Sequence, residues 1–397
     1  MVADRVNEIA VSETMVISAE AKKLKTEGVD VINLSMGEPD FHTPNNIKEA
    51  GKTGIDENHT RYTINSGTVE LRTAIQAKLK RENHLEYKLN EIIVSNGAKQ
   101  SCYNAILATV NPGDEVIIPA PYWVSYPAMV NLAQGKAIII DTDESTGFRI
   151  TPQQLNKAIT PKTKMLILCN PSNPTGSAYN KKQLEELAEA TEAADFYILA
   201  DEIYEKVVYD DFIFFSFAQA APKLRNRIIL VNGISKSYAM TGWRIGYTAA
   251  NESVIEGMNK IQSHSTSHAS SISQVAAIEA LTGPQYVINE MFVEFRKRRE
   301  FLHNELTSIK GVSCYKPEGA FYLFPNISAY LKKHSEILKI ETSFDFAMHL
   351  LYEAHIAVVP GNAFGAEGYI RMSYATSMEN LKEAVIRLKK ALAKLVL

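Results

Sequence analysis

Short apolar runs alternate with polar-faced helical stretches between about residues 90 and 250. Each run is apolar and ends in a polar turn, and the runs occupy residues 92–94, 116–118, 137–140, 165–168 and 196–199. Runs of this kind predict strands that are buried on both faces. In the stretch 182–194, Leu184, Leu187 and Ala188 share one helical face, which predicts a helix packed on the sheet. The alternation predicts an α/β fold with a mostly parallel sheet flanked by helices.

The pattern changes near residue 285. The helical stretches and apolar runs beyond that point occupy residues 294–306, 319–324, 357–360 and 378–397. This mixture predicts a second, smaller α+β domain. The polar stretch 262–271 lies between two helical patterns and is the clearest candidate for a disordered loop. We therefore expect a large domain at 46–284 and a smaller domain at 285–397.

Lys236 lies in a polar turn between two strand-like runs, at 228–231 and 244–250. Loops at the ends of strands often carry binding and catalytic groups, so a lysine in this position is presented to a ligand. Arg244 adds a fixed positive charge that suits an anionic group near the lysine. A lone lysine is usually a surface residue. The functional interpretation of Lys236 therefore depends on the other motifs of the chain.

The charge and composition exclude several classes of partner. The 397 residues carry a net charge of −3, and the sequence pI is about 6.3. These values predict no basic surface for nucleic acid or anionic lipid. No uninterrupted apolar run approaches the roughly 18 residues that span a bilayer, so we expect no membrane association. Small molecules are the expected partners, and the cytoplasm is the expected compartment.

The sequence predicts neither a metal site nor a disulfide framework. Cys102, Cys169 and Cys314 are widely spaced and form no C-x-x-C pair, which fits a reducing compartment. His264 and His268 have the i, i+4 spacing of helical metal ligands, but Ser-Thr-Ser separates them and no acidic residue is near. We interpret the two histidines as parts of a solvated loop.

A series of motifs follows one order along almost the whole chain. The motifs are Met36-Gly37-Glu38-Pro39-Asp40-Phe41, Tyr62 before Asn65-Ser66-Gly67, Asn96-Gly97-Ala98-Lys99-Gln100, Pro121-Tyr122-Trp123, Asn170-Pro171-Ser172-Asn173-Pro174-Thr175-Gly176, Asp201-Glu202-Ile203-Tyr204, the stretch 234–247, and Ile370-Arg371-Met372-Ser373-Tyr374-Ala375. Together they resemble the class I, fold-type I aminotransferases that depend on pyridoxal 5′-phosphate, and within them the bacterial aspartate aminotransferase branch. The resemblance implies that cofactor, a homodimer, and residues 1–45 packed with the smaller domain.

The resemblance also implies roles at the cofactor. Lys236 is the amine that binds it, and the freed lysine then moves a proton as base and acid. Asp201 directly follows a predicted strand, at the sheet edge where ligands of α/β folds bind, and there it can keep the pyridine nitrogen protonated. A helix N-cap is the alternative role for Asp201. Tyr204 and Asn173 match the partners of the phenolic oxygen, and Trp123 matches the ring that stacks on the cofactor.

The expected phosphate site begins at the turn before a helix that we predict to start near Ala98. Backbone N–H groups of Ala98 and Lys99 at such a helix start can bind an anion. By resemblance, the other phosphate ligands are Ser235, Arg244 and Tyr62, the last reaching the site of the neighbouring subunit. The family often has Ser or Thr three positions before the lysine, where this chain has Gly233. Ser235 or Ser237 is expected to substitute.

Substrate binding is assigned to Arg371, whose guanidinium can hold the α-carboxylate through two parallel hydrogen bonds. Gly37 is matched to a backbone contact on that carboxylate, and Trp123 and Asn173 complete the substrate site. Lys99 has two open interpretations. By resemblance it faces the distal carboxylate of a dicarboxylic substrate, and the alternative is a second contact to the phosphate.

These roles predict an aminotransferase that works in two half-reactions through aldimine, quinonoid and ketimine states. L-Aspartate (or glutamate) with 2-oxoglutarate is the expected substrate pair. Transfer to prephenate is an alternative, because Lys99 and Arg371 would recognise two carboxylates there as well. A pyridoxal phosphate-dependent carbon–sulfur β-lyase of the same fold is a second alternative. A cofactor-binding transcription regulator is disfavoured, because the chain begins directly with the enzyme pattern.

Overall fold

The structure is a computed structural model of the whole chain, and it describes residues 2–7, 9, 13–334 and 339–395. Its central feature is a sheet of seven strands among these residues. In spatial order the strands are β2 (Ile92–Ser95), β8 (Gly246–Ala249), β7 (Ile228–Gly233), β6 (Tyr197–Asp201), β5 (Thr163–Cys169), β3 (Glu115–Ala120) and β4 (Lys136–Asp141). All neighbours pair in parallel except β8, which is antiparallel to both β2 and β7. The predicted α/β fold with a mostly parallel sheet is confirmed.

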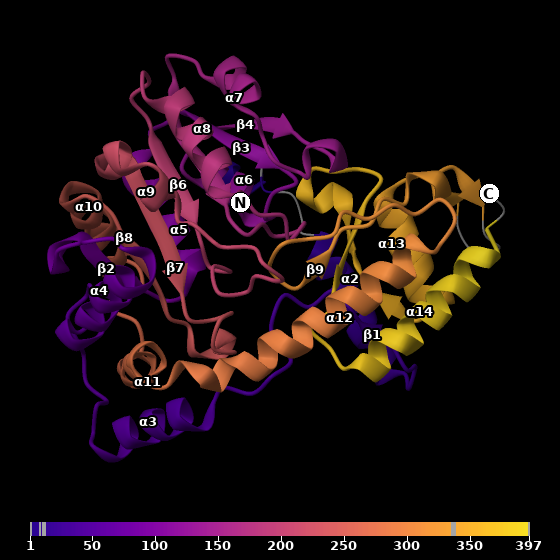
Figure 1. Cartoon of the computed structure of the whole chain (residues 1–397), viewed down its shortest axis with the longest axis horizontal. Helices are drawn as coiled ribbons and strands as arrows, with labels where there is room; N and C mark the ends of the chain where they lie inside the picture. Colours follow the sequence, from indigo (N-terminus) through magenta and orange to yellow (C-terminus); the bar gives the residue numbers. More distant parts are fainter. Residues whose placement is uncertain (1, 8, 10–12, 335–338, 396–397) are drawn as a thin grey trace.

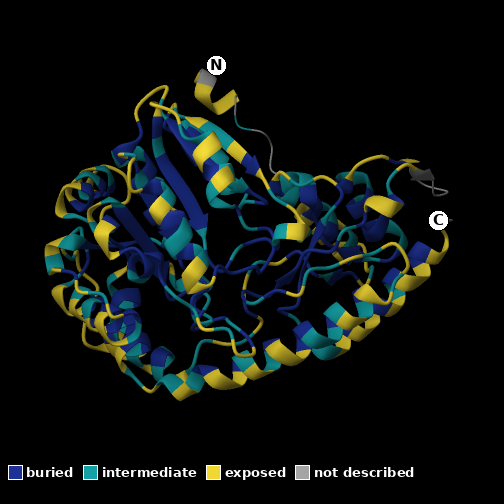
Figure 2. Ribbon diagram, turned by 45° about the horizontal axis from the view of Figure 1, so that its top comes forward, coloured by how far each residue is buried: buried dark blue, intermediate teal, exposed yellow. Residues whose placement is uncertain are grey.

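Alternate residues of each central strand enter different hydrophobic cores, because successive side chains of a strand point to opposite faces. Ile198 packs in one core and Leu199 in the other. Helices cover both faces (Figure 1), and they are α4 (Val69–Asn83), α5 (Ala98–Thr109), α6 (Ser125–Leu132), α7 (Pro152–Ala158), α8 (Lys181–Thr191), α9 (Phe217–Ala220), α10 (Glu252–Ser263) and α11 (Ser271–Thr282). Helix α3 (Asn45–Asp56) packs on α11. Figure 2 shows the central strands buried and the outer helix faces exposed.

The strand directions bring distant motifs to one edge of the sheet. Strands β2, β3, β5, β6 and β7 all point the same way, so their carboxyl ends meet at this edge. The antiparallel strand β8 starts there. The turns that follow β2, β5, β6 and β7 therefore lie at the edge where ligands of α/β folds bind.

Elements from both termini form a second body beside the sheet (Figure 1). Its helices are α2 (Glu13–Thr26), α12 (Asn289–Thr307), α13 (Ser343–Glu353) and α14 (Met378–Ala393), and a short helix α1 (Asp4–Asn7) precedes them. Its strands are β1 (Ile32–Asn33), β9 (Tyr322–Leu323), β10 (Lys333–His334), β11 (Lys339–Ile340), β12 (Ile356–Ala357), β13 (Val359–Pro360) and β14 (Ile370–Ser373). Strand β1 pairs in parallel with β12, which ties the N-terminal segment to the C-terminal elements. The domain limits 46–284, 1–45 and 285–397 stay a prediction.

Several predicted boundaries differ from the structure. The helix predicted at 182–194 is Lys181–Thr191, and the one predicted at 294–306 extends over Asn289–Thr307. The final helix ends at Ala393, and residues 396 and 397 of the predicted helix lie outside the described residues. The strand predicted at 244–250 is limited to Gly246–Ala249, because Arg244 adopts a left-handed conformation with φ 58°. Asp201 is the last residue of its strand rather than the residue after it.

The predicted loop at 262–271 is shorter in the structure, where residues 264–270 connect α10 to α11. Gln262 belongs to α10 and is fully buried, and α11 already begins at Ser271. The Gln262 amide donates to the carbonyls of Asn65 and Val94 and accepts from the side chains of Ser95 and Asn104. A buried amide with four hydrogen bonds is a specific structural connector.

Candidate active site

Lys236 lies just after β7, and its amine is near the rings of Tyr204 and Phe321. Its side chain is half-buried, and its ammonium donates a hydrogen bond to the carbonyl of Gly37. Burial lowers the pKa of Lys236 to about 8; the charges of Arg371 and Arg244 act in the same direction, whereas Glu38 and Asp201 oppose it. A lysine with this pKa is partly deprotonated near neutral pH, which is the state that acts as a nucleophile.

Asp201 ends β6 and is 4% exposed. Its Oδ2 accepts a hydrogen bond of 2.7 Å from Tyr126 and lies 3.6 Å from the thiol of Cys102. Its Oδ1 accepts from the amide of Ile203 at 3.3 Å. Burial raises the pKa of Asp201, and these donors together with the charge of Lys236 lower it again. The structure thus has a buried carboxylate and a half-buried lysine whose charges interact.

Glu202 points away from this carboxylate into a different environment. Its Oε1 accepts from the Ser216 hydroxyl at 2.9 Å and from the Phe217 amide at 2.8 Å, whereas Oε2 has no partner among the described residues. Burial, assisted by the charge of Glu205, raises the pKa of Glu202 to about 8. Two adjacent acidic residues therefore have separate surroundings, and Glu202 is largely uncharged at neutral pH.

The predicted anion-binding turn joins two motifs that are far apart in the sequence. Gly97 has φ 85° and precedes α5, and the Arg244 guanidinium packs against it so closely that a Cβ on Gly97 would collide. Arg244 donates to the carbonyls of Thr241 and Asn96, at 2.9 and 3.2 Å. The exposed guanidinium and the first amides of α5, beginning at Ala98, thus lie together at a helix start, which suits an anion.

Arg371 is a buried cation without a carboxylate partner in the described part of the chain. It is 7% exposed, donates to Asn173 Oδ1 at 2.9 Å and to the Ser35 carbonyl at 2.7 Å, and stacks on Tyr322 at 4.5 Å. Its Nε has no hydrogen-bond partner there. Burial lowers the pKa of Arg371. A buried guanidinium with only neutral partners and an unused donor is suited to bind an anion.

The structure brings Lys99 and Trp123 together. The Lys99 ammonium lies 4.9 Å from the centroid of the half-buried Trp123 ring. The lysine side chain is exposed in the single chain, and partial burial of its ammonium, together with the charge of Arg244, lowers its pKa. The described residues provide no carboxylate partner for Lys99, so its charge is available to a ligand.

Tyr204 is buried, and its hydroxyl lies 2.8 Å from that of Tyr322. Tyr322 also stacks with Arg371, and its hydroxyl is next to Gly37. Tyr322 was missed as a site residue, although its apolar run at 319–324 was recognised. Aromatic residues in a run of this kind normally indicate a core strand, so no local signal marks its role.

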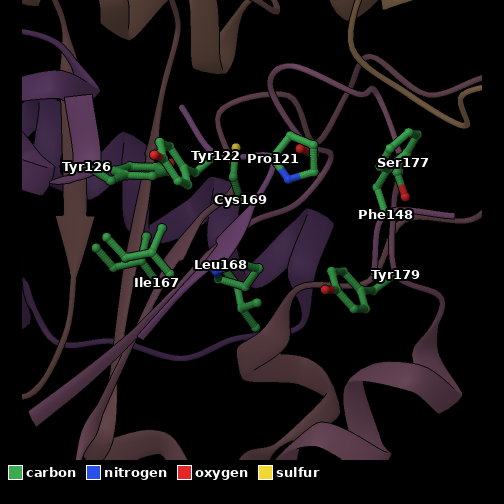
Figure 3. Close-up of a pocket in the computed structure, with 12 residues that line it drawn as sticks. Pro121, Tyr122, Tyr126, Phe148, Ile167, Leu168, Cys169, Ser177 and Tyr179 are labelled. Atoms are coloured by element: carbon green, nitrogen blue, oxygen red, sulfur yellow. The ribbon is translucent and has the colours of Figure 1, made fainter. Parts of the chain in front are cut away.

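Tyr126 and Cys102 were also missed, because each lies within a helix whose apolar pattern conceals its contact with Asp201. Figure 3 shows Tyr126, Tyr122 and Cys169 around a small cavity at the carboxyl ends of the strands, with a volume of about 20 Å³. This volume is about enough for one water molecule. Tyr126 thus lies between that cavity and the carboxylate.

Tyr62 and Ser235, the other two predicted phosphate ligands, do not take part in the contacts described above. Tyr62 is 94% exposed, and its ring contact among the described residues is with His268, at 5.6 Å. Ser235 is buried beside Lys236.

The described residues contain no group of three or more His, Cys, Asp or Glu side chains arranged to hold a metal ion, and none of their helices is long and apolar enough to cross a membrane.

Comparisons with known proteins agree with this geometry. Residues 29–388 match the family model for class I and II aminotransferases. A probable aspartate/prephenate aminotransferase of Rickettsia bellii is 48% identical over 393 residues, covering 98% of each chain. The crystal structure of the aspartate aminotransferase from Rhizobium meliloti superposes with a TM-score of 0.96 at 46% identity, covering 100% of each chain. An aspartate aminotransferase from Thermus thermophilus, solved with maleate, gives 0.92 at 39% identity and covers 98% of this chain and 99% of its own.

Proposed function

The chain belongs to the class I and II aminotransferases, and from that premise we propose that it binds pyridoxal 5′-phosphate and transfers the amino group of L-aspartate to a 2-oxo acid. The observation that carries the proposal is the amine of Lys236, with a pKa of about 8, close to the buried carboxylate of Asp201. A buried carboxylate beside a lysine with a lowered pKa is typical of a catalytic site.

The residues fit the proposed cofactor. Lys236 offers the amine for its aldehyde, Asp201 offers a carboxylate for its ring nitrogen, and the start of α5 with Arg244 offers a site for its phosphate. We propose Ser235 and the Tyr62 of a second subunit as further phosphate ligands. Tyr204 and Asn173 are proposed for the phenolic oxygen, and Trp123 for the ring face. When bound, pyridoxal phosphate supplies an aldehyde that condenses with amines and a ring that withdraws electrons.

The proposed chemistry of the chain is movement of one proton. Lys236 would take the proton from the substrate Cα and return it to the former aldehyde carbon of the cofactor, on the other side of the amino nitrogen. Asp201 must be ionised to hold a proton on the ring nitrogen. Arg371 and the backbone at Gly37 fix the α-carboxylate, so that the Cα–H bond faces the lysine.

The proposed substrate is dicarboxylic because Lys99 and Arg371 are two site cations without a carboxylate partner in the described structure. Arg371 is suited to one carboxylate and Lys99 to the other. Aspartate and glutamate fit this pair, and the names of the relatives point to aspartate. The Thermus thermophilus structure was solved with maleate, which is also a dicarboxylate.

Prephenate is the second candidate amino acceptor. Relatives at 48% identity carry the name aspartate/prephenate aminotransferase, and prephenate also has two carboxylates. The carbon–sulfur β-lyase alternative differs in its products, because a lyase releases pyruvate and ammonia without any need for a 2-oxo acid. Measuring whether amino-group transfer depends on the added oxo acid separates the two reaction classes.

We infer a homodimer from exposed apolar side chains in the segment of the chain that contains Tyr62. Ile64 is 55% exposed, Ile55 is 53% exposed and Val69 is 43% exposed, and all lie in or between α3 and α4. Exposed apolar patches of this kind mark protein–protein contacts.

A cytoplasmic location is proposed from the three free cysteines, Cys102, Cys169 and Cys314.

The function is tested by spectroscopy of the purified protein loaded with pyridoxal phosphate. Single amino acids are added one at a time, and the visible absorption is followed. Aspartate and glutamate should bleach the yellow colour, and 2-oxoglutarate or prephenate should restore it. If aspartate leaves the spectrum unchanged while another amino acid bleaches it, the substrate assignment is wrong. If no amino acid acts on a loaded protein, the aminotransferase proposal for this site is wrong.

A further inference from the structure

Two uncharged side chains from different helices converge on one oxygen of Asp201. Tyr126 comes from α6 and donates to Oδ2 at 2.7 Å, and Cys102 comes from α5 with its sulfur 3.6 Å from the same oxygen. Both helices cover the same face of the sheet, and both side chains are almost completely buried. Burying a tyrosine hydroxyl or a thiol in an apolar core without a hydrogen-bond partner costs free energy. Asp201 therefore also serves as the hydrogen-bond acceptor that these two groups need.

Asp201 has to be charged for its proposed role, yet its surroundings disfavour a charge. Burial is the largest influence on this carboxyl and raises its pKa. Tyr126, the amide of Ile203 and Cys102 are the donors that counter this effect, in that order, followed by the positive charge of Lys236. When the amine of Lys236 is neutral, the donors alone remain to stabilise the carboxylate.

The donors themselves do not titrate near neutral pH. Burial, followed by the adjacent charge of Asp201, raises the pKa of Tyr126 and of Cys102 well above their usual values. Cys169, on β5 beside Asp201, also has a raised pKa because it is buried. The charged or titratable groups around Asp201 are therefore two protonated thiols, one protonated phenol and the amine of Lys236.

We propose that Tyr126 and Cys102 are positioning residues that hold Asp201 ionised and in a fixed orientation, so that it can keep the ring nitrogen of the cofactor protonated. The proposal rests on the proposed function, because it concerns how Asp201 acts on that cofactor. Tyr126 should dominate, because its O–H···O contact is short and the thiol is a weak donor at a longer distance. The Ile203 amide fixes the other oxygen and cannot be removed by a side-chain substitution.

The test compares Tyr126→Phe with Tyr122→Phe in the holoenzyme. Both substitutions remove only a phenol hydroxyl, and both rings line the cavity in Figure 3, but Tyr122 makes no hydrogen bond to Asp201 in the described structure. Pyridoxal phosphate labelled with ¹⁵N at the ring nitrogen is bound to each protein. The ¹⁵N chemical shift reports the protonation of that nitrogen, and cofactor dissociation is measured by dialysis.

Tyr126→Phe should lower the ratio of protonated to unprotonated ring nitrogen by about ten- to a hundred-fold, the effect of one hydrogen bond to a charged group. Its cofactor should dissociate more readily, and kcat should fall more than KM changes. Tyr122→Phe should match the wild type in all three measurements. An unchanged ¹⁵N shift and cofactor affinity in folded Tyr126→Phe would overturn the proposal.

A second pair of variants decides the matter if Tyr126→Phe does not fold. Cys102→Ala removes the thiol donor, whereas Cys102→Ser keeps a donor at the same position. The alanine variant should move the ¹⁵N signal toward the unprotonated value, and the serine variant should restore it. Equal signals for both would overturn the role of Cys102. If the wild-type protein itself fails to bind the cofactor at Lys236, the proposed function fails instead of this inference.

Discussion

Replacement of Lys99 by alanine tests how this site recognises its substrate. The Lys99 ammonium lies over the Trp123 ring, has no carboxylate partner in the described structure, and is repelled by Arg244. A substrate carboxylate at this position would relieve that repulsion. Lys99→Ala should therefore weaken binding of aspartate and glutamate in the transition state and leave alanine or phenylalanine nearly unaffected, if they react at all.

The size of the effect follows from the environment of Lys99. Truncating one partner of a buried, hydrogen-bonded charge pair costs about 2–5 kcal/mol, or a factor of about 30 to several thousand. Because Lys99 is exposed in the single chain, we expect the lower end of this range, about a 30-fold loss in kcat/KM for aspartate. The assay is steady-state transfer from each amino donor to 2-oxoglutarate.

Two controls are needed to interpret the effect of Lys99→Ala. Lys182→Ala removes an exposed lysine whose side chain is 84% exposed on α8, and it should change nothing. Cofactor affinity is measured for Lys99→Ala in parallel. An equal loss for every donor, together with weaker cofactor binding, would mean that Lys99 contacts the phosphate. The assignment of a dicarboxylic substrate would then lose its structural basis.

Three further experiments give distinct expectations. Asp201→Ala should lower kcat by several orders of magnitude while the fold survives, because the carboxylate acts chiefly in the transition state; near-normal kcat in a cofactor-loaded variant, measured by steady-state kinetics, would reject its role. Hybrid dimers of Lys236→Ala and Tyr62→Phe chains should regain activity over either parent, since one site is then intact; a monomer at assay concentration, measured by sedimentation, would contradict the shared site. The pKa of Glu202 is raised from 4.5 to about 8, so the folded protein keeps a proton that the unfolded chain releases. The free energy of unfolding of the wild type should therefore fall as the pH rises from about 5 to 8, relative to that of Glu202→Gln. In urea unfolding, the free energy of unfolding of the wild type should fall by at most about 1.4 kcal/mol per pH unit relative to the variant. If this free energy depends on pH in the same way in both proteins, the carboxyl of Glu202 is not held neutral by burial.

The sheet could be predicted because most of its strands are buried on both faces. The prediction of a buried strand at 137–140 is wrong for the edge strand β4, where Ile139 is 39% exposed. Strands buried on both faces are continuous apolar runs, and the polar turns that end them, including those at Gly97, Asp201 and Lys236, must lie at sheet edges. The orientation of β8 could not be predicted in this way, since an apolar run does not reveal its direction. The left-handed conformation of Arg244 could not be predicted either, because residues other than glycine rarely adopt it.

The missed residues share one physical feature, which is that their role depends on long-range contacts. Gln262 is polar and lies in a Ser-rich stretch, yet its four hydrogen bonds hold together segments that are distant in sequence. Tyr126 and Tyr322 are aromatic and buried, so they resemble ordinary core residues. Only the folded arrangement reveals that their hydroxyls contact Asp201 and Tyr204.

The central claim is that Lys236 holds the cofactor, and one measurement tests it most directly. Borohydride reduction of the pyridoxal phosphate-loaded protein makes the bond between lysine and cofactor permanent, and peptide mapping by mass spectrometry then locates the label. The lowered pKa of Lys236 and the nearby Asp201 predict one labelled peptide, which contains Lys236, and no label in Lys236→Ala. Stoichiometric label on any other lysine would contradict the account.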